Sequence, residues 1–326
     1  MIRRCAIALL GLLGASSLEC QAQSSIAKAE QPIRMEVRVV NVHVTVKDRK
    51  GQLVPNLGAP DFAVREDGRP RDLDYFAGES KSEMPVLVIL LIDTSTSQSQ
   101  VLSKERHIAT RFLERVFRPG DQAAVVTFDS NVYVLQSATS DLALLGRALE
   151  HIQPFAPGFS SELPPAQQPN GTRTCAAAAW AADWQASLPG DRKVIILISD
   201  AVDLELDLKL KFALGTALQN DVMIYAIRIL DPKAYAGEDG SRVRAGERAL
   251  RLLASETGGL FFNGNNPRFL EAAFTEIAAE VRGQYSLGFV PQYLTYNTRF
   301  HSIAVAVKQK GTKVRARRGY YSPSPR

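Results

Sequence analysis

The sequence predicts an α/β protein: a mostly parallel six-stranded sheet with helices on both faces, inserted in a small β-sandwich formed by the two chain ends. Continuous apolar runs, VLVILLI at residues 86–92 and KVIILIS at 193–199, are typical of parallel strands that are buried on both faces. Strand patterns alternate with helix patterns between residues 85 and 283, which indicates a parallel sheet. Alternating β patterns flank this region on both sides, so we expect it to interrupt a sandwich.

Composition excludes some classes of protein but names no partner. The chain has 326 residues, 45% hydrophobic and 22% charged, which is an ordinary globular composition and excludes disorder as the default state. The formal net charge is +5, a mildly basic balance that does not by itself indicate a nucleic acid or an acidic substrate.

Residues 1–22 have the pattern of a secretory signal peptide. Two arginines precede a short apolar core, and a small-x-small sequence predicts cleavage after Ala22. The mature protein is therefore expected to be secreted, periplasmic or at the cell surface. We expect no transmembrane segment in it, because no later stretch approaches ~20 apolar residues. A lipid anchor on Cys20 is an alternative that Glu19 disfavours, since small residues are expected before a lipidated cysteine.

Two segments outside the α/β region have β character. Residues 33–80 contain the alternating runs MEVRV and VNVHVTV and the hairpin pattern FAVREDGRPRDLDYF. Residues 284–322 contain YSLGFV, HSIAVAV and KVRARRGYYS, and we expect them to pack with residues 33–80. The basic residues of KVRARR alternate with Val and Ala, which favours the solvated face of an edge strand.

The region 85–283 is predicted as a single α/β domain. Its expected strands are 86–92, 122–128, 131–138, 193–200, 221–229 and 259–263, and its expected helices are 101–117, 141–152, 174–188, 207–219, 247–257 and 267–282. Only Asp129 and Ser130 separate the second strand from the third, so this pair must be antiparallel. If the strand order is 3-2-1-4-5-6, the first and fourth strands are neighbours at the switch point.

Oxygen-bearing side chains follow those two neighbouring strands. Asp93, Ser95 and Ser97 come at the end of the first strand, and Asp200 ends the fourth. Thr172 follows a glycine in the long loop between them. Hydroxyl and carboxylate oxygens suit a hard cation such as Mg²⁺. Because the carboxyl ends of parallel strands open into one crevice, the sequence predicts a cation site there.

These residues resemble the metal-ion-dependent adhesion site of von Willebrand factor type A (VWA) domains, which have a Rossmann-like fold. The flanks GQLVPNL, DFAVREDG and RGQYSLGFVP are similar to secreted VWFA-related proteins of acidobacterial type. The resemblance implies that Ser95 and Ser97 coordinate Mg²⁺ or Mn²⁺ directly and that Thr172 binds directly or through water. It also implies that Asp93 and Asp200 act mainly through waters. One coordination position would remain for an Asp or Glu side chain of a protein partner.

The sequence departs from the family pattern in three places. Thr96 and Gln98 stand where the family has glycine and methionine, and NGTRTCAAA lacks a later aspartate that the family has. These departures leave every expected ligand in place but change the loops that carry the ligands.

Other interpretations of the same residues are open. Asp and Ser are common caps at strand-to-helix turns, and a metal-independent scaffold with a vestigial site is the main alternative function. A metal-dependent hydrolase is a third. A strand that ends in Asp-Thr also occurs in haloacid-dehalogenase-type phosphatases, but Ser95 stands where they need an acid/base carboxylate. The sequence therefore predicts no enzyme and no catalytic residues. Secretion and the absence of interleaved aromatics predict no nucleic-acid partner.

Overall fold

The computed structural model describes residues 39–78, 85–153, 174–190, 192–202, 206–236, 240–291 and 299–322. They belong to one compact unit, Arg38–Arg326. The predicted signal peptide at residues 1–22 and the long loop that carries Thr172 lie outside the described residues.

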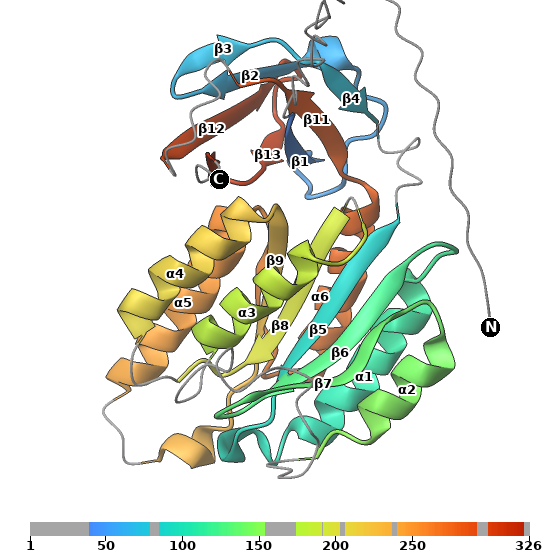
Figure 1. The fold of residues 1–326 in the computed structure, drawn as a ribbon, viewed down its shortest axis with the longest axis vertical. Helices are drawn as coiled ribbons and strands as arrows, with labels where there is room; N and C mark the ends of the chain where they lie inside the picture. Colours follow the sequence, from blue (N-terminus) through green and yellow to red (C-terminus); the bar gives the residue numbers. More distant parts are fainter. Residues whose placement is uncertain are drawn as a thin grey trace, which may run out of the picture. The chain divides into compact units, whose positions relative to one another are not determined.

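A six-stranded sheet forms the centre of the α/β region (Figure 1). Its strands are β5 (Val86–Asp93), β6 (Gln122–Phe128), β7 (Val132–Thr139), β8 (Arg192–Ser199), β9 (Val222–Arg228) and β10 (Phe261–Asn263). The order is β10-β9-β8-β5-β6-β7, and only β7 runs antiparallel to its neighbour. This is the order on which the prediction of neighbouring first and fourth strands depends. Because β5 pairs with β8 up to Ile92 and Ile198, the two strands end side by side.

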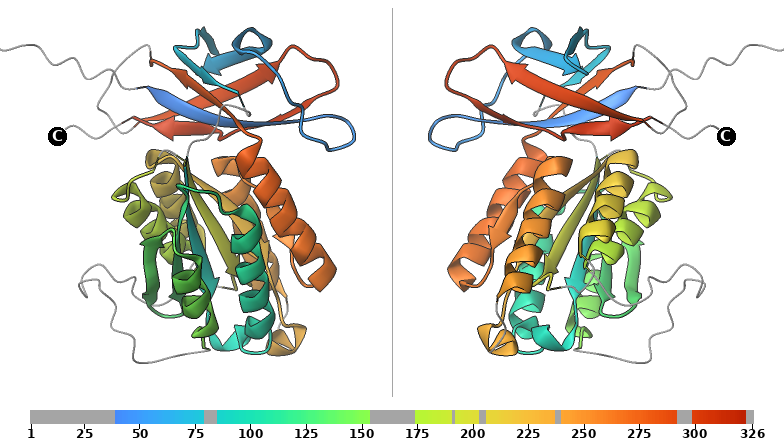
Figure 2. Two further views of the ribbon diagram at one scale, coloured as in Figure 1. Left: turned by 90° about the vertical axis from the view of Figure 1, so that its right-hand side faces the viewer. Right: turned by 90° about the vertical axis from the view of Figure 1, so that its left-hand side faces the viewer.

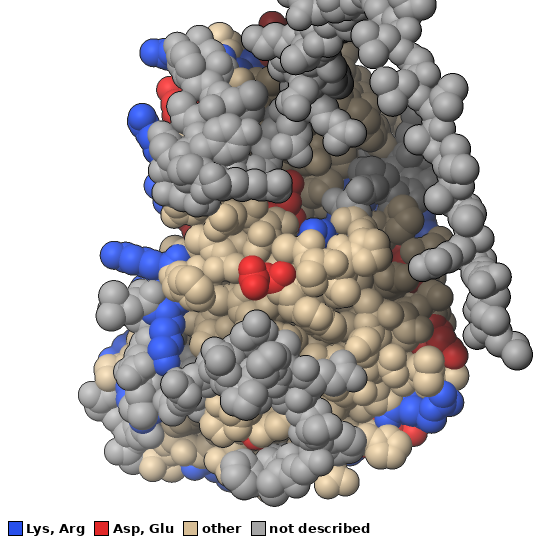
Figure 3. All heavy atoms as spheres, viewed as in Figure 1, with Lys and Arg blue, Asp and Glu red and all other residues tan. Residues whose placement is uncertain are grey.

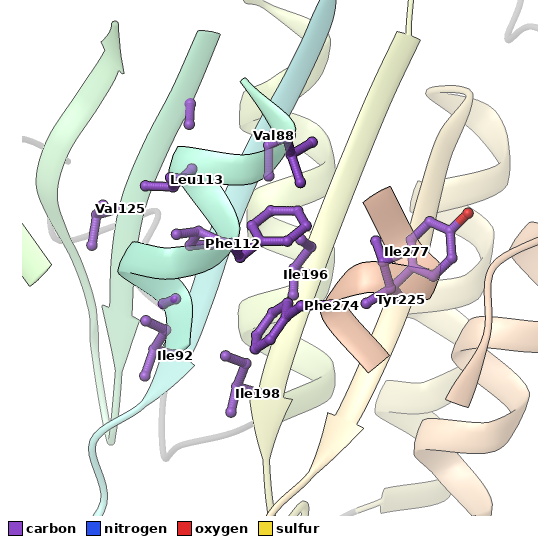
Figure 4. Close-up of a cluster of buried hydrophobic side chains, with 14 of the residues drawn as sticks. Val88, Ile92, Phe112, Leu113, Val125, Ile196, Ile198, Tyr225, Phe274 and Ile277 are labelled. Atoms are coloured by element: carbon purple, nitrogen blue, oxygen red, sulfur yellow. The ribbon is translucent and has the colours of Figure 1, made fainter. Parts of the chain in front are cut away.

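Helices cover both faces of this sheet, as Figure 2 shows edge-on. One face is covered by α1 (Leu102–Val116), α2 (Leu142–Glu150) and α6 (Pro267–Arg282), and the other by α3 (Thr174–Ala186), α4 (Leu206–Gln219) and α5 (Ser241–Thr257). Phe112 of α1 and Phe274 of α6 pack with ring centroids 5.0 Å apart, close to Ile196 of β8 (Figure 4). The strands can be continuous apolar runs because helices exclude water from both of their faces.

The chain ends form two four-stranded antiparallel sheets with the orders β13-β1-β11-β4 and β14-β12-β2-β3. The strands are β1 (Val40–Lys47), β2 (Phe62–Glu66), β3 (Arg69–Arg71), β4 (Tyr75–Ala77), β11 (Tyr285–Phe289), β12 (Phe300–Val307), β13 (Lys313–Arg315) and β14 (Gly319–Tyr321). N-terminal β1 pairs with C-terminal β11, from Val40 opposite Phe289 to Val44 opposite Tyr285. Their buried side chains form a third apolar core. The predicted fold class is confirmed.

Helix α5 begins at Ser241, six residues before the predicted start at 247. The predicted start leaves Gly246 outside the helix, whereas the structure includes it. In the structure a Cβ at this position would lie 2.1 Å from the carbonyl oxygen of Ala201. The glycine therefore lets α5 pack directly against the backbone that follows β8.

The segment KVRARRGYYS lies at sheet edges, as predicted, but its basic side chains are not all solvated. It divides between β13 and β14, which belong to different sheets. Arg315 forms an ion pair with Glu280 of α6, and Arg317, which is buried, pairs with Asp221 at 2.5 Å. These arginines join the sandwich to the α/β domain, a role that depends on partners distant in sequence.

The surface around α3 and β7 carries few charges. The described part of the face seen in Figure 3 is mostly uncharged, and β7 and α3 contain one ionisable carboxylate, Asp183, and no lysine or arginine. Among the described residues, no helix combines the length and apolar character needed to cross a membrane.

Candidate metal centre

The loop after β5 folds around the carboxylate of Asp93. The backbone N–H of Ser95 donates to Asp93 Oδ1 at 2.9 Å. A short 3₁₀ turn, Thr96–Gln98, follows and leads toward α1. This turn places the hydroxyl oxygens of Ser95 and Ser97 3.0 Å apart. The two predicted hydroxyl ligands therefore lie next to each other at the end of β5.

Asp200 approaches the same loop from the end of β8. Its Oδ2 accepts hydrogen bonds from the Ser97 hydroxyl at 2.7 Å, the Gln98 side-chain amide at 2.7 Å and the Tyr235 hydroxyl at 2.6 Å. Its Oδ1 accepts from the backbone N–H of Val202 at 3.1 Å. These donors fix the carboxylate beside the serine hydroxyls.

A second set of hydrogen bonds links Asp93 to β8. The hydroxyl of Ser199 donates to Asp93 Oδ2 at 2.6 Å and lies 3.1 Å from the hydroxyl oxygen of Thr174. Thr174 is the first residue of α3. The structure thus brings together Asp93, Ser95, Ser97 and Asp200, whereas the predicted Thr172 lies outside the described residues.

The cluster concentrates negative charge in a place with little water. Asp93 and Asp200 are 4% and 3% exposed, and Glu105 in the first turn of α1 is 1% exposed. Burial, together with the charge of Asp200, raises the pKa of Asp93 to about 7. Burial, then the charges of Asp93 and Asp200, raise the pKa of Glu105 well above its usual range. A positive charge at this position would relieve both effects.

The residues present fit a hard divalent cation. The donor set consists of hydroxyl and carboxylate oxygens, which Mg²⁺ and Mn²⁺ prefer. Both Glu105 carboxylate oxygens and Gln98 Oε1 are buried and have no hydrogen-bond partner among the described residues. No group of three or more His, Cys, Asp or Glu side chains in the described ranges is arranged to hold a metal ion. Serine hydroxyls and water would therefore have to supply part of the coordination shell.

Sequence reasoning missed several residues of this cluster. The sequence does not predict the hydrogen bond that Gln98 donates to Asp200. Ser199 precedes Asp200 directly and could have been proposed from that position alone. Tyr235 and Glu105 carry no comparable signal, because only the fold brings the segment after β9 and the buried side of α1 to this loop.

Residues 88–202 match the von Willebrand factor type A domain family. This part of the chain is a von Willebrand factor type A domain. The match begins in β5 and ends just after β8, so it includes both aspartates of the cluster. The predicted resemblance to VWA domains is confirmed.

Several solved structures are similar to the VWA domain. An aerotolerance-related membrane protein from Bacteroides fragilis shares 19% identity at a TM-score of 0.44, covering 60% of this chain and 98% of that one. BatB from Bacteroides thetaiotaomicron shares 20% identity at 0.44, covering 60% and 97%. The vWF domain of the type V pili tip protein Mfa5 from Porphyromonas gingivalis shares 17% identity at 0.43, covering 61% and 95%. No curated protein matches the sequence.

Proposed function

We propose that the VWA domain is a non-enzymatic protein-binding module of an exported protein and that it recognises its partner through one divalent cation. Ser95 and Ser97 would hold Mg²⁺ or Mn²⁺ directly, with Thr172 as a further ligand. Asp93 and Asp200 would act mainly by orienting the serines and water. The cation would supply a positive charge that accepts the carboxylate of a partner's Asp or Glu.

The observation that carries this proposal is the hydrogen-bonded cluster of Asp93, Ser95, Ser97 and Asp200. The Ser97 hydroxyl joins the two strand ends through its 2.7 Å hydrogen bond to Asp200. Simple capping would account for a serine bonded to its own loop, but it does not account for a bond across two strands. Asp93 and Asp200 are both buried, and among the described residues no cationic side chain pairs with either of them. Capping does not explain why two unpaired carboxylates lie together in a buried place.

Some residues of the cluster would hold the cation, and others position the two carboxylates. Ser95 and Ser97 present lone pairs on adjacent oxygens. Gln98 and Tyr235 donate to Asp200 Oδ2, which limits the rotation of that carboxylate. Ser199 does the same for Asp93. We infer that these three residues keep the carboxylates in place when a partner side chain enters.

Calorimetric titration with Mg²⁺ and with Mn²⁺ tests the cation site. The wild-type protein should bind one ion saturably, and Ser95→Ala and Asp200→Asn should each weaken binding by about tenfold or more, because each removes a charged or polar oxygen contact. Ser99→Ala is the matched control, since this exposed serine lies in the same loop and outside the cluster. It should bind as the wild type does.

A peptide array tests the partner chemistry. Each Asp- or Glu-containing peptide is paired with its Asn or Gln counterpart, and binding is measured with Mg²⁺ and with chelator. Binding that requires both the carboxylate and the ion supports the proposal. Peptide binding that persists in chelator and in Ser95→Ala would instead support the metal-independent scaffold.

A further inference from the structure

A basic hollow lies on the β-sandwich and shares no residue with the VWA cluster. Its volume is about 390 Å³, and it is lined by the end of β1, the turn that follows β1, and β13. The cationic residues of its lining are Lys47, Arg49, Lys50, Lys313 and Arg315. A hollow of this size is large enough for a small ligand or a headgroup.

Two of these cations are neutralised by α6. Lys47 Nζ lies 2.5 Å from Glu276 and 2.6 Å from Glu280, and Arg315 forms an ion pair with Glu280. Their contacts fix the inner wall of the hollow, because both side chains are held by carboxylates that belong to the α/β domain.

Three of the cations have no such compensation. Arg49, Lys50 and Lys313 are exposed, and no ion pair involves them within the described part of the chain. The acidic residue of the lining is Asp48, whose Oδ1 accepts the backbone N–H groups of Lys50 and Gln52 at 2.8 and 2.9 Å. The hollow therefore keeps a surplus of positive charge.

The strand register places Lys313 beside the neutralised Lys47. Lys47 of β1 stands directly opposite Lys313 of β13. Because Glu276 and Glu280 neutralise Lys47, Lys313 is the cation of this pair whose charge remains available to a bound anion. Protection of an edge strand explains a lysine on β13, but it does not explain two more cations in the facing turn.

The guanidinium of Arg49 lies beside a neighbouring turn. Gly311 has φ of +80°, and a Cβ there would lie 2.9 Å from Arg49 Nε. The turn between β12 and β13 thus leaves room for the guanidinium at the edge of the hollow. A guanidinium can donate two parallel hydrogen bonds to an oxyanion.

We propose that this hollow binds a phosphate group, as a free phosphorylated ligand or as a phospholipid headgroup. A phosphate monoester carries about −1.5 to −2 charge at pH 7 and three acceptor oxygens, which matches one guanidinium and two ammonium groups. A single carboxylate would leave most of the surplus charge uncompensated. The proposal is independent of the cation site in the VWA domain.

Binding of inorganic phosphate and pyrophosphate, measured by calorimetry at low salt, tests the site. Wild-type protein should bind both saturably, with pyrophosphate tighter. The double variant Arg49→Glu, Lys313→Glu should lose affinity by about tenfold or more, since two charged contacts are reversed. The control is Arg248→Glu, Lys211→Glu, which changes the same exposed residue types on α5 and α4. It should remain within about twofold of wild type, as expected for screened distant charges.

Vesicles distinguish the two sources of phosphate. The protein is sedimented with phosphatidylcholine vesicles that contain phosphatidic acid. Cosedimentation that is lost in the Arg49→Glu, Lys313→Glu variant, and kept in the control variant, supports a lipid headgroup as the ligand. Binding of soluble pyrophosphate without sedimentation supports a free ligand. Equal losses in both double variants, or no binding of any probe by the folded wild type, would overturn the proposal.

Discussion

At the scale of single residues, one carboxylate oxygen of Asp200 accepts several of the hydrogen bonds that hold the cluster together. Asp200 Oδ2 accepts three donors, one of them from Gln98, which stands where the resemblance to VWA domains implies a methionine. The replacement adds a hydrogen bond to a buried carboxylate, so the departure strengthens the position of Asp200. A methionine could not donate this bond.

Asp93 gives the metal-free protein a defined pH dependence. Its folded pKa of about 7 exceeds the usual value of 3.8, so the folded state binds this proton more tightly than the unfolded chain does. The free energy of unfolding should therefore fall as pH rises from about 4 to about 7, by on the order of 4 kcal/mol, and then level off. Glu105 shifts in the same direction.

Chemical denaturation in chelator at several pH values measures this effect. Asp93→Asn should reduce the slope, whereas Glu114→Gln, at an exposed position on α1, should keep it. Mg²⁺ should stabilise the wild type more at pH 8 than at pH 5, because the ion favours ionised carboxylates. An unchanged slope in Asp93→Asn would contradict this explanation.

At the scale of elements, the approach of α5 to the end of β8 positions the candidate site. Ala201 has φ of 53°, which turns the chain sharply after Asp200, and Gly246 of α5 packs against this turn. The sequence predicted α5 but placed its start too late, because the close contact that requires glycine is tertiary.

Two glycine substitutions test this packing. Gly246→Ala should lower the free energy of unfolding by about 1–3 kcal/mol and weaken cation binding, since its Cβ would displace α5 from the turn after Asp200. Gly215→Ala in α4 is the matched control: a Cβ there meets no atom within 4 Å, so the variant should gain about 0.5–1 kcal/mol. Urea unfolding and Mg²⁺ calorimetry of both variants measure the outcome, and similar values for the two would refute the steric argument.

At the scale of the whole described unit, buried polar contacts join the sandwich to the VWA domain. Arg192, at the start of β8, is fully buried and donates to the carbonyl oxygen of Val281 at 2.5 Å and to the Ser286 hydroxyl at 3.3 Å. Glu280 of α6 binds Lys47 and Arg315. These contacts link α6 to strands from both chain ends, so the sandwich and the domain should unfold together.

Glu280 provides the test of that cooperation. Glu280→Gln leaves the partly buried Arg315 without its carboxylate and Lys47 with Glu276 alone, and should cost about 3–5 kcal/mol of stability. Glu276→Gln, at a side chain 42% exposed, should cost less than about 1 kcal/mol. Thermal and denaturant unfolding should show one transition for the wild type. Two separate wild-type transitions would contradict the single cooperative unit.

The sequence by itself determined the fold class, the antiparallel pairing of β6 with β7 and the positions of Asp93, Ser95, Ser97 and Asp200 at the ends of β5 and β8. These follow from local patterns, because apolar runs, turn lengths and the strand-end rule depend on neighbouring residues. Tertiary structure alone decided the roles of Tyr235, Glu105, Gly246 and the C-terminal arginines. Their partners lie tens to hundreds of residues away, so no local pattern could indicate which of them would be buried, paired or close to the candidate site.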